Sequence, residues 1–337
     1  MKSSDRVAVA SRSFSINPIL RAELSARYGA VTFNSEGRKL AGAELVSFLA
    51  GHQKAIVALE HVTRDVLARL PDLRVIAKYG VGLDNLDLRA MADRGVRLGW
   101  TPGVNKRSVA ELAIAYSILL LRDLPGLMSE VRSGTWRQRP GRELRSAIVG
   151  VVGCGHVGKE VVRLLRPFGC RILAHDVKPQ PEFYADLGVE SVSLDVLLAR
   201  ADVVTLHLSL NPTSRGLFNE ERIAAMRREA VMVNLSRGGI VDERALKRAL
   251  VRGAIAGAAF DVFAVEPPDD AELLALPNFF VSPHIGGSSQ DAILEMGRAA
   301  IAGLDGHHEL YEYLRQGYLE FSSLSDPRDD RIETNVA

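Results

Sequence analysis

Short runs of β-branched and other apolar residues alternate with longer stretches of helical periodicity, an alternation that is typical of parallel α/β folds. It occurs on both sides of a junction at Thr101-Pro102-Gly103-Val104. Before the junction the pattern predicts helices near residues 19–28 and 42–50, and strands at residues 7–10, 55–58, 74–77 and 97–100. After the junction it predicts helices that alternate with strands at residues 148–152, 171–175, 203–206, 231–234, 256–260 and 279–281. The sequence therefore predicts two parallel α/β domains.

A helix start signal follows the junction. Ser108-Val109-Ala110-Glu111 has the form of a capping box, so we expect a helix to begin at Ser108. Its apolar positions, which include Leu112, Tyr116 and Leu121, cover more than one stripe of the helix. Full burial within one domain and a subunit interface both explain this pattern. The apolar run at residues 112–121 is shorter than the roughly 18 residues of a membrane span, so we interpret it as a buried helix.

Composition narrows the classes of function. The chain has 337 residues, of which 47% are hydrophobic, enough for two cores and a cleft. Its 42 basic and 41 acidic side chains nearly cancel, which argues against nucleic-acid or membrane partners and favours small ligands. Cys154 and Cys170 suit neither a disulfide framework nor a metal site, and residues 1–6 lack an apolar signal region, so we expect a cytoplasmic protein without a metal. The charged tail at residues 326–331 is expected to be mobile.

A glycine-rich turn follows one of the predicted strands. Gly153, Gly155 and Gly158 have the G-x-G-x-x-G spacing, in which the first two glycines allow a tight turn close to a pyrophosphate and the third lets a helix pack on the strand. The N-terminus of that helix, expected over residues 159–168, presents N–H groups to phosphates. Asp176 ends the next predicted strand, where a carboxylate accepts hydrogen bonds from the adenosine ribose and repels a 2′-phosphate. The turn and the carboxylate together predict NAD as the cofactor.

Three further polar clusters follow predicted strands of the second half, and they contain Arg237, Glu266 and His284 in turn. Each has an ordinary interpretation when taken alone, as a solvated loop charge, a turn carboxylate and a hydrogen-bonded loop histidine. Ligands of open α/β sheets bind at the carboxyl ends of the strands, so we expect the three loops to converge on the nicotinamide end of the cofactor. At successive strand ends of one dinucleotide-binding domain, these residues form a candidate reaction set.

These residues resemble those of the D-isomer-specific 2-hydroxyacid dehydrogenase family. The resemblance includes the glycine-rich turn and the three clusters that contain Arg237, Glu266 and His284. It also rests on four further segments that occur in the family order within about residues 73–304, namely Lys78-Tyr79-Gly80-Val81-Gly82-Leu83-Asp84-Asn85, Thr101-Pro102-Gly103-Val104-Asn105, Ser108-Val109-Ala110-Glu111 and Gly141-Arg142-Glu143-Leu144. It implies two parallel-sheet domains, Rossmann-like or flavodoxin-like. Residues 105–287 would form the NAD-binding domain, and residues 1–104 and 288–337 one discontinuous substrate domain. It also implies a homodimer that associates through the nucleotide-binding domain.

A 2-oxo acid carries a carbonyl beside a carboxylate, and its reduction needs a bridging cation, a proton donor and a well-placed hydride. Arg237 suits the first task because its guanidinium stays charged and binds a carboxylate with a planar fork. His284 suits the second because imidazole gives and takes a proton near neutral pH. Glu266, bonded to the far ring nitrogen, would hold the tautomer and favour the protonated ring. We therefore predict an NAD-dependent oxidoreductase that interconverts a D-2-hydroxy acid and its 2-oxo acid.

The resemblance adds a substrate clamp and a set of cofactor contacts. It implies that the backbone N–H groups of Val81 and Gly82 bind the substrate carboxylate. It also implies that Asp261 accepts a hydrogen bond from the nicotinamide carboxamide. The other implied cofactor contacts are His156, Val157, Leu208, Leu235, Ser236, Gly286 and Gly287. Cys154-Gly155-His156 stands where many relatives carry Leu-Gly-Arg. This difference weakens the positive charge that the protein places beside the pyrophosphate, but it keeps the backbone N–H groups that bind it.

The identity of the acid is left open by these residues. Lys78 precedes a glycine-rich turn and Arg12 follows the first predicted strand, so both are candidates to add positive charge for a second anionic group such as a phosphate. The alternative is that one or both are solvated or paired internally. A substrate like 3-phosphoglycerate and an unphosphorylated one such as glyoxylate or hydroxypyruvate both stay open. From another class, an NADH-sensing regulator of the C-terminal-binding-protein type of corepressor shares this scaffold.

Overall fold

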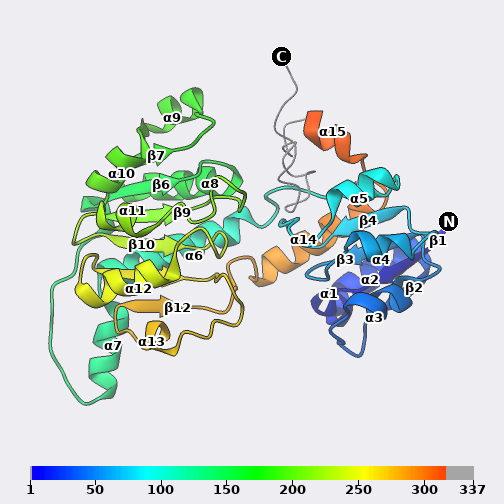
Figure 1. Cartoon of the computed structure of the whole chain (residues 1–337), viewed down its shortest axis with the longest axis horizontal. Coiled ribbons are helices and arrows are strands. Elements are labelled where there is room, and N and C mark those ends of the chain that lie inside the picture. The colour runs from blue at the N-terminus through cyan, green and yellow to red at the C-terminus, as the bar shows by residue number, and fades with distance from the viewer. Residues whose placement is uncertain (1, 316–337) are drawn as a thin grey trace. The chain divides into compact units, whose positions relative to one another are not determined.

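The computed structural model describes residues 2–315. The segment at residues 326–331, expected to be mobile, lies outside the described residues. Contacts divide the described residues into unit 1, which holds residues 2–105 and 290–315, and unit 2, which runs from Lys106 to Ser289. In each unit, helices cover a parallel sheet (Figure 1). The predicted α/β class is therefore confirmed.

The described part of unit 1 contains a five-stranded parallel sheet with the order β2-β1-β3-β4-β5. Its strands are β1 (Ser3–Val9), β2 (Tyr28–Phe33), β3 (Lys54–Val57), β4 (Val75–Lys78) and β5 (Arg97–Gly99). Its helices are α1 (Arg12–Ile16), α2 (Pro18–Arg27), α3 (Gly42–Leu49), α4 (Arg64–Ala68), α5 (Leu88–Asp93), α14 (Gln290–Gly303) and α15 (Leu310–Arg315). β3 and β4 are buried along their whole length, as expected of central parallel strands that helices cover on both faces.

The C-terminal segment packs closely into unit 1. A Cβ at Gly99 of β5 would lie 2.1 Å from the carbonyl oxygen of Gly303 at the end of α14, so the two backbones touch. The Lys54 ammonium at the start of β3 pairs with Asp305, 2.9 Å away. Unit 1 is therefore built from both ends of the chain.

One strand of unit 1 was not predicted. The helix expected near residues 19–28 ends at Arg27, and β2 starts at the next residue. β2 lies at the edge of the sheet, and most of its side chains are exposed or half-buried. Because its residues are exposed and include Gly29, the strand shows neither an apolar run nor a clean alternation.

Unit 2 lies wholly within the described residues and contains a seven-stranded parallel sheet with the order β12-β11-β10-β9-β6-β7-β8. Its strands are β6 (Ile148–Val152), β7 (Arg171–His175), β8 (Glu190–Ser191), β9 (Val203–Leu206), β10 (Val231–Asn234), β11 (Gly257–Phe260) and β12 (Phe279–Val281). Its α-helices are α6 (Lys106–Leu121), α7 (Leu124–Arg132), α8 (His156–Leu165), α9 (Pro181–Leu187), α10 (Leu194–Arg200), α11 (Glu220–Ala224), α12 (Glu243–Arg252) and α13 (Ala271–Leu274), with 3-10 turns η1 (Leu144–Ser146) and η2 (Arg166–Phe168). The strand order reverses between β6 and β9, so their carboxyl ends form the switch point at which open α/β sheets bind ligands.

Two helix starts differ from the prediction. α6 begins ahead of Ser108, and Ser108 is not its cap, because its hydroxyl donates to the carbonyl oxygen of Gly286 at 2.6 Å. The helix expected over residues 159–168 begins earlier, at His156, and ends at Leu165. The local signals therefore located both helices but not their first residues.

α6 is only partly covered by unit 2. Ala113 and Leu121 are buried in the core, whereas Leu112 is half-buried. α7 extends away from the sheet (Figure 1) and buries none of its residues, and its Met128 and Val131 are exposed. Among the described residues no single helix is long and apolar enough to cross a membrane; α6 and α7 meet that test only as a pair, with a 62° bend between them.

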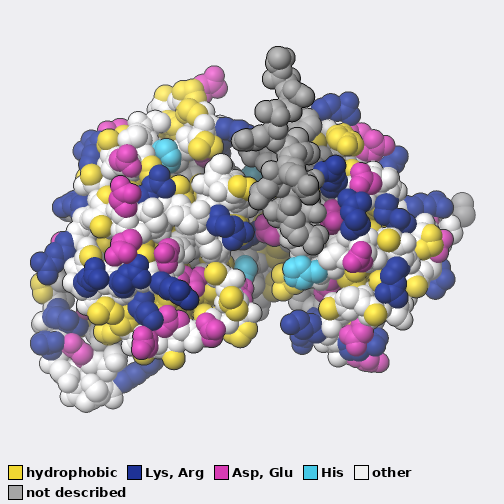
Figure 2. All heavy atoms as spheres, in the orientation of Figure 1, with side chains coloured by type: hydrophobic (Ala, Val, Ile, Leu, Met, Phe, Trp, Pro, Cys, Tyr) yellow, Lys and Arg dark blue, Asp and Glu magenta, His cyan; other side chains and the backbone are white. Residues whose placement is uncertain are grey.

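Lys and Arg side chains gather over α12 on the face of unit 2 shown in Figure 2. They alternate with carboxylates: Lys247 pairs with Asp270 at 2.8 Å, and Arg248 pairs with Glu220 at 2.7 Å. This face is therefore a network of ion pairs rather than a surface of unbalanced positive charge.

Candidate active site

The glycine-rich turn of residues 153–158 joins β6 to α8 at the switch point. Gly153 has a φ of 88°, and a Cβ there would lie 2.6 Å from the carbonyl oxygen of His207. A Cβ at Gly158 would lie 2.0 Å from the carbonyl oxygen of Gly153, whereas one at Gly155 would meet no atom within 4 Å. Only glycine fits the first and third positions, and the second leaves room for a ligand to approach the backbone.

The N-terminus of α8 is open to an anion. Gly155 stands at its N-cap and no side chain caps it, so the first N–H groups, including those of His156 and Val157, are available to a ligand. Burial, together with the charges of Lys106 and Lys159, lowers the pKa of His156, so its ring is neutral near pH 7. The amides and dipole of this helix therefore suit a pyrophosphate without a cation from the histidine.

Asp176 lies beside the glycine turn, directly after β7. Its Oδ2 accepts a hydrogen bond from the backbone N–H of Cys154 at 2.5 Å, and its Oδ1 accepts one from Lys178 at 2.8 Å. Each oxygen keeps lone pairs that can accept from ribose hydroxyls. The turn, the open helix end and this carboxylate together fit NAD.

His207, at the end of β9, was not predicted as part of the site. Its Nε2 is bonded to the Thr205 hydroxyl at 2.9 Å, and its Nδ1 is buried with no hydrogen-bond partner among the described residues. Burial lowers the pKa of His207 to about 3, so the ring is neutral. Its position directly after a strand at the switch point is a signal that the sequence carries, whereas the buried ring nitrogen without a partner becomes visible only in the folded chain.

Arg237 lies in the loop after β10 and is half-buried. Its guanidinium donates to the carbonyl oxygen of Ser236 at 2.8 Å, and its own carbonyl oxygen accepts from the Asn234 amide at 3.2 Å. A Cβ at Gly238 would lie 1.9 Å from the backbone of Phe263, so the loops after β10 and β11 are in backbone contact. Glycine at this position therefore brings the Arg237 loop against the loop that leads to the predicted glutamate.

Glu266 and His284 form a hydrogen-bonded pair. Glu266 Oε2 lies 2.8 Å from His284 Nδ1, and the other carboxylate oxygen accepts from the backbone N–H of Phe263 at 3.0 Å. The two side chains are 37% and 47% exposed, so a ligand can reach them. Because the glutamate occupies Nδ1, Nε2 is the nitrogen that can exchange a proton with a substrate. His284 sits in the loop after β12, residues 282–287, called here the His284 loop, with a φ of 54° in the left-handed region.

Asp261 organises the His284 loop. It is 1% exposed, and its carboxylate accepts from the backbone N–H groups of Ile285 at 2.8 Å and Gly286 at 2.7 Å, and from the Ser282 hydroxyl. Its carbonyl oxygen accepts from the N–H of His284 at 2.9 Å. Oδ2 carries only one of these bonds, so it keeps a lone pair for the predicted carboxamide contact.

The remaining predicted cofactor contacts lie along the same edge of the sheet. Leu208 follows β9, Leu235 and Ser236 follow β10, and Gly286 and Gly287 close the His284 loop. The carboxyl ends of parallel strands share one edge, so unit 2 alone brings together every predicted cofactor and reaction residue.

Lys78, in unit 1, ends β4 and is 4% exposed. Its ammonium donates to the carbonyl oxygen of Ala58 and, at 2.6 Å, to Asn85 Oδ1. The Asn85 amide in turn donates to the carbonyl oxygens of Ala58 at 3.1 Å and Glu60 at 2.6 Å. Lys78 thus ties the segment after β4 to the loop after β3, which favours internal pairing over a charge that faces a phosphate.

The other substrate-side candidates of unit 1 lie in its loops. Val81 and Gly82 are half-buried in the turn after β4, and the Trp100 indole donates to the carbonyl oxygen of Val81 at 3.1 Å. Arg12 is exposed at the start of α1, and a Cβ at Gly37 would lie 3.6 Å from its Nε. Arg12 therefore lies against the loop after β2.

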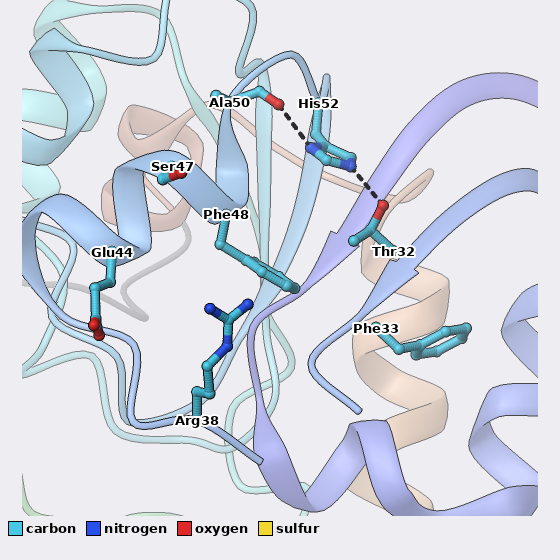
Figure 3. Close-up of a pocket in the computed structure, with 8 residues that line it drawn as sticks. All are labelled: Thr32, Phe33, Arg38, Glu44, Ser47, Phe48, Ala50 and His52. Carbon is cyan, nitrogen blue, oxygen red and sulfur yellow. Dashed lines mark hydrogen bonds between the residues drawn. The ribbon is translucent and has the colours of Figure 1, made fainter. Parts of the chain in front are cut away.

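A hollow of about 470 Å³ beside β2 contains none of the predicted residues (Figure 3). Its lining consists of Thr32, Phe33, Arg38, Glu44, Ser47, Phe48, Ala50 and His52. The His52 ring is bonded to the Thr32 hydroxyl at 2.9 Å and to the carbonyl oxygen of Ala50 at 3.1 Å. Over residues 2–315, no cluster of three or more His, Cys, Asp or Glu side chains is placed to hold a metal ion.

Residues 114–286 match the family model described as D-isomer specific 2-hydroxyacid dehydrogenase, NAD binding domain. D-3-phosphoglycerate dehydrogenase from Methanocaldococcus jannaschii is 39% identical over 234 residues, which are 68% of this chain and 45% of the relative. Hydroxypyruvate reductase from Thermotoga maritima is 37% identical over 242 residues, 70% of this chain and 78% of the relative. The crystal structure of a glyoxylate reductase from Paecilomyes thermophila has a TM-score of 0.79 and 27% identity, covering 90% of this chain and 97% of that one. The chain spans about half the length of the D-3-phosphoglycerate dehydrogenases it matches.

Proposed function

We propose that this chain, which belongs to the D-isomer specific 2-hydroxyacid dehydrogenase family, is an NAD-dependent enzyme that interconverts a D-2-hydroxy acid and its 2-oxo acid. The observation that carries the proposal is the 2.8 Å hydrogen bond between Glu266 and His284, which joins the loops after two adjacent strands of unit 2. An oriented and exposed imidazole of this kind is suited to general acid and base catalysis.

Arg237 binds the substrate and stabilises charge. Its planar guanidinium pairs with the carboxylate and reaches the neighbouring carbonyl oxygen, where negative charge develops as the carbonyl is reduced. Val81 and Gly82 of unit 1 hold the carboxylate from their backbone N–H groups. In this proposal unit 1 is the substrate domain and unit 2 the NAD-binding domain.

His284 moves the proton. In the reducing direction its Nε2 donates a proton to the carbonyl oxygen, and in the oxidising direction the same nitrogen accepts the proton of the hydroxyl. Glu266 holds the ring through Nδ1 and so leaves Nε2 to the substrate. Bound NADH supplies the hydride that the carbonyl carbon receives.

The glycine turn and Asp176 hold the cofactor. The N–H groups at the start of α8 bind the pyrophosphate, and Asp176 accepts from the ribose hydroxyls and selects NAD over NADP. Asp261 accepts from the nicotinamide carboxamide at its remaining lone pair. The other contacts are those of His156, Val157, Leu208, Leu235, Ser236, Gly286 and Gly287.

The substrate that we favour is an unphosphorylated 2-oxo acid such as hydroxypyruvate or glyoxylate. Lys78 gives its hydrogen bonds to groups inside unit 1, and Arg12 lies against the loop after β2. The hydroxypyruvate reductase relative is also covered over far more of its length than the D-3-phosphoglycerate dehydrogenase relative. A phosphorylated acid such as 3-phosphohydroxypyruvate is the second candidate, supported by the 39% identity to that relative.

A second copy of the chain is the proposed partner of unit 2. α7 buries no residue, and its Leu124, Met128 and Val131 are 40%, 51% and 52% exposed, while Trp136 beyond it is 82% exposed. An apolar patch of this kind marks an interaction site on a soluble protein. A homodimer through α6 and α7 would cover it. Light scattering measures the mass directly.

Nucleic acids and membranes are not among the proposed partners, because the cations over α12 are paired with carboxylates. We propose a cytoplasmic location on the basis of the two thiols, Cys154 and Cys170, which are buried and unpaired.

NADH oxidation with glyoxylate, hydroxypyruvate, pyruvate and 3-phosphohydroxypyruvate, at one enzyme concentration, tests the proposal. Turnover of at least one acid, with the D-hydroxy acid as product, is expected. No turnover on the panel, together with capture of a stoichiometric protein partner only when NADH is present, would favour the corepressor-type regulator instead.

A further inference from the structure

We propose that Tyr116 and Ser282 are positioning residues for the proton donor, acting through Asp261 on the His284 loop. The Ser282 backbone also meets His284, whose N–H donates to the Ser282 carbonyl oxygen at 3.1 Å, but the proposal concerns the two hydroxyl groups, which act through Asp261. The inference rests on the proposed function only in taking His284 as the proton donor.

The three side chains form one directed chain of hydrogen bonds. The Tyr116 hydroxyl donates to Ser282 Oγ at 2.5 Å, and Ser282 Oγ donates to Asp261 Oδ1. An ionised carboxylate only accepts, so the single proton of the serine must go to Asp261, and the serine must accept from the tyrosine. Burial, with a smaller contribution from the charge of Asp261, raises the pKa of Tyr116, so the phenol remains a donor at neutral pH. Tyr116 is therefore the donor, Ser282 both accepts and donates, and Asp261 is the acceptor in this series of hydrogen bonds.

The series of hydrogen bonds ends at the Asp261 carboxylate, which holds the His284 loop. The carboxylate that Ser282 steadies accepts from Ile285 and Gly286, the two residues after His284. His284 itself is held at a φ of 54°, a left-handed conformation that is unfavourable for a non-glycine residue and persists where neighbouring bonds enforce it. Loosening Asp261 would release the backbone on which the imidazole stands.

α6 holds the loop at both ends. Tyr116 binds Ser282 at its start, and Ser108 of the same helix donates to the carbonyl oxygen of Gly286 near its end at 2.6 Å. The Tyr116 ring also packs edge-on against Phe280 of β12, with the ring centres 5.3 Å apart. The position of the proton donor is thus set by a helix that contributes no side chain to the chemistry.

The variants Tyr116→Phe and Ser282→Ala each remove one hydroxyl from the series of hydrogen bonds that runs from Tyr116 through Ser282 to Asp261. The variant Ser282→Thr keeps a hydroxyl at position 282. Tyr28→Phe is the matched control, because Tyr28 is buried in unit 1 and donates to Asp305 at 2.6 Å. For Tyr116→Phe and Ser282→Ala we expect kcat to fall about 10-fold, and the double variant Tyr116→Phe with Ser282→Ala to be no slower than Ser282→Ala alone. Ser282→Thr should keep wild-type kcat, and Tyr28→Phe should lower only stability.

Hydrogen exchange of the Ile285 and Gly286 amides gives a readout that does not need turnover. We expect about 10-fold faster exchange in Tyr116→Phe and Ser282→Ala, and wild-type exchange in Ser282→Thr and Tyr28→Phe. Unchanged exchange at these amides in both Tyr116→Phe and Ser282→Ala would overturn the proposal. Additive effects of the two substitutions on kcat in the double variant would also overturn it. If the wild-type protein reduces no 2-oxo acid, the proposed function fails, and the exchange rates still decide whether Tyr116 and Ser282 hold the loop.

Discussion

Both units carry charged side chains at the carboxyl ends of parallel strands, but the two sets differ in what they bind. Lys78 in unit 1 is 4% exposed and gives hydrogen bonds to Ala58 and Asn85. Glu266 and His284 in unit 2 are 37% and 47% exposed and are bonded to each other. A buried ammonium has to be satisfied inside the protein, whereas a half-exposed pair keeps a free ring nitrogen for a ligand. The number of internal partners, more than position at a strand end, decides which charge is available for chemistry.

Replacing the exposed imidazole should have the largest effect. In His284→Gln we expect kcat to fall about 10³-fold, because the proton donor is lost. The affinity for NADH, measured by fluorescence titration, should stay near that of the wild type, since the His284 side chain is not among the proposed cofactor contacts. Undiminished turnover would remove His284 from the mechanism.

Neutralising Glu266, the hydrogen-bond partner of His284, should lower kcat less than replacing His284. Glu266→Gln keeps an oxygen that can accept from Nδ1 but replaces a charge-assisted hydrogen bond with a weaker neutral one that orients the ring less firmly, so we expect about a 10²-fold loss of kcat with little change in NADH affinity. Steady-state kinetics of this variant beside Glu243→Gln, a carboxylate whose Oε1 accepts from the N–H of Ala264, gives a control within unit 2. Equal losses in the two variants would show a general effect of charge rather than a pair.

Removing the buried ammonium should affect stability rather than specificity. Lys78→Met leaves Asn85 Oδ1 without its lysine donor and leaves the Ala58 carbonyl oxygen with the Asn85 amide alone, so we expect a loss of about 2–3 kcal/mol in the free energy of unfolding, measured by urea denaturation. The ratio of KM for phosphorylated and unphosphorylated 2-oxo acids should be unchanged. A selective rise of KM for 3-phosphohydroxypyruvate would instead place Lys78 at a phosphate.

His207 extends the comparison to a buried histidine of unit 2, with the smallest expected effect. Its folded pKa of about 3 lies below that of free histidine, about 6.5, so the unfolded chain binds more protons between these values and acid favours unfolding. The contribution of the neutral His207 ring to the free energy of unfolding is fully present above about pH 6.5. It is lost as the pH falls, by at most about 2 kcal/mol at pH 5. His207→Gln should reduce this loss, measured as unfolding free energy at pH 7 and pH 5. Identical slopes for the variant and the wild type would contradict it.

Much of the fold could be predicted because central strands such as β6 and β10 are largely buried and rich in valine, so they stand out in the sequence. β2 could not, because an edge strand that exposes one side carries a weak pattern. The start of α6 was wrong because Ser108 bonds to Gly286, far along the chain, rather than capping its own helix.

The positions of the candidate residues could be predicted because polar clusters after parallel strands share one edge of the sheet. Their partners could not. The bonds from Asp261 to the His284 loop and from Lys78 to Asn85 depend on tertiary packing, and no local pattern distinguishes a satisfied lysine from an available one. His207 was missed for the same reason, since its buried ring nitrogen becomes visible only in the folded chain.

The most direct test is one assay of NADH oxidation on three proteins, the wild type, His284→Gln and Lys78→Met, with the best acid of the panel. We expect that the wild type turns over, that His284→Gln loses about 10³-fold in kcat, and that folded Lys78→Met stays within a few-fold of the wild type. Full activity in His284→Gln, or a loss in folded Lys78→Met as large as that in His284→Gln, would contradict it.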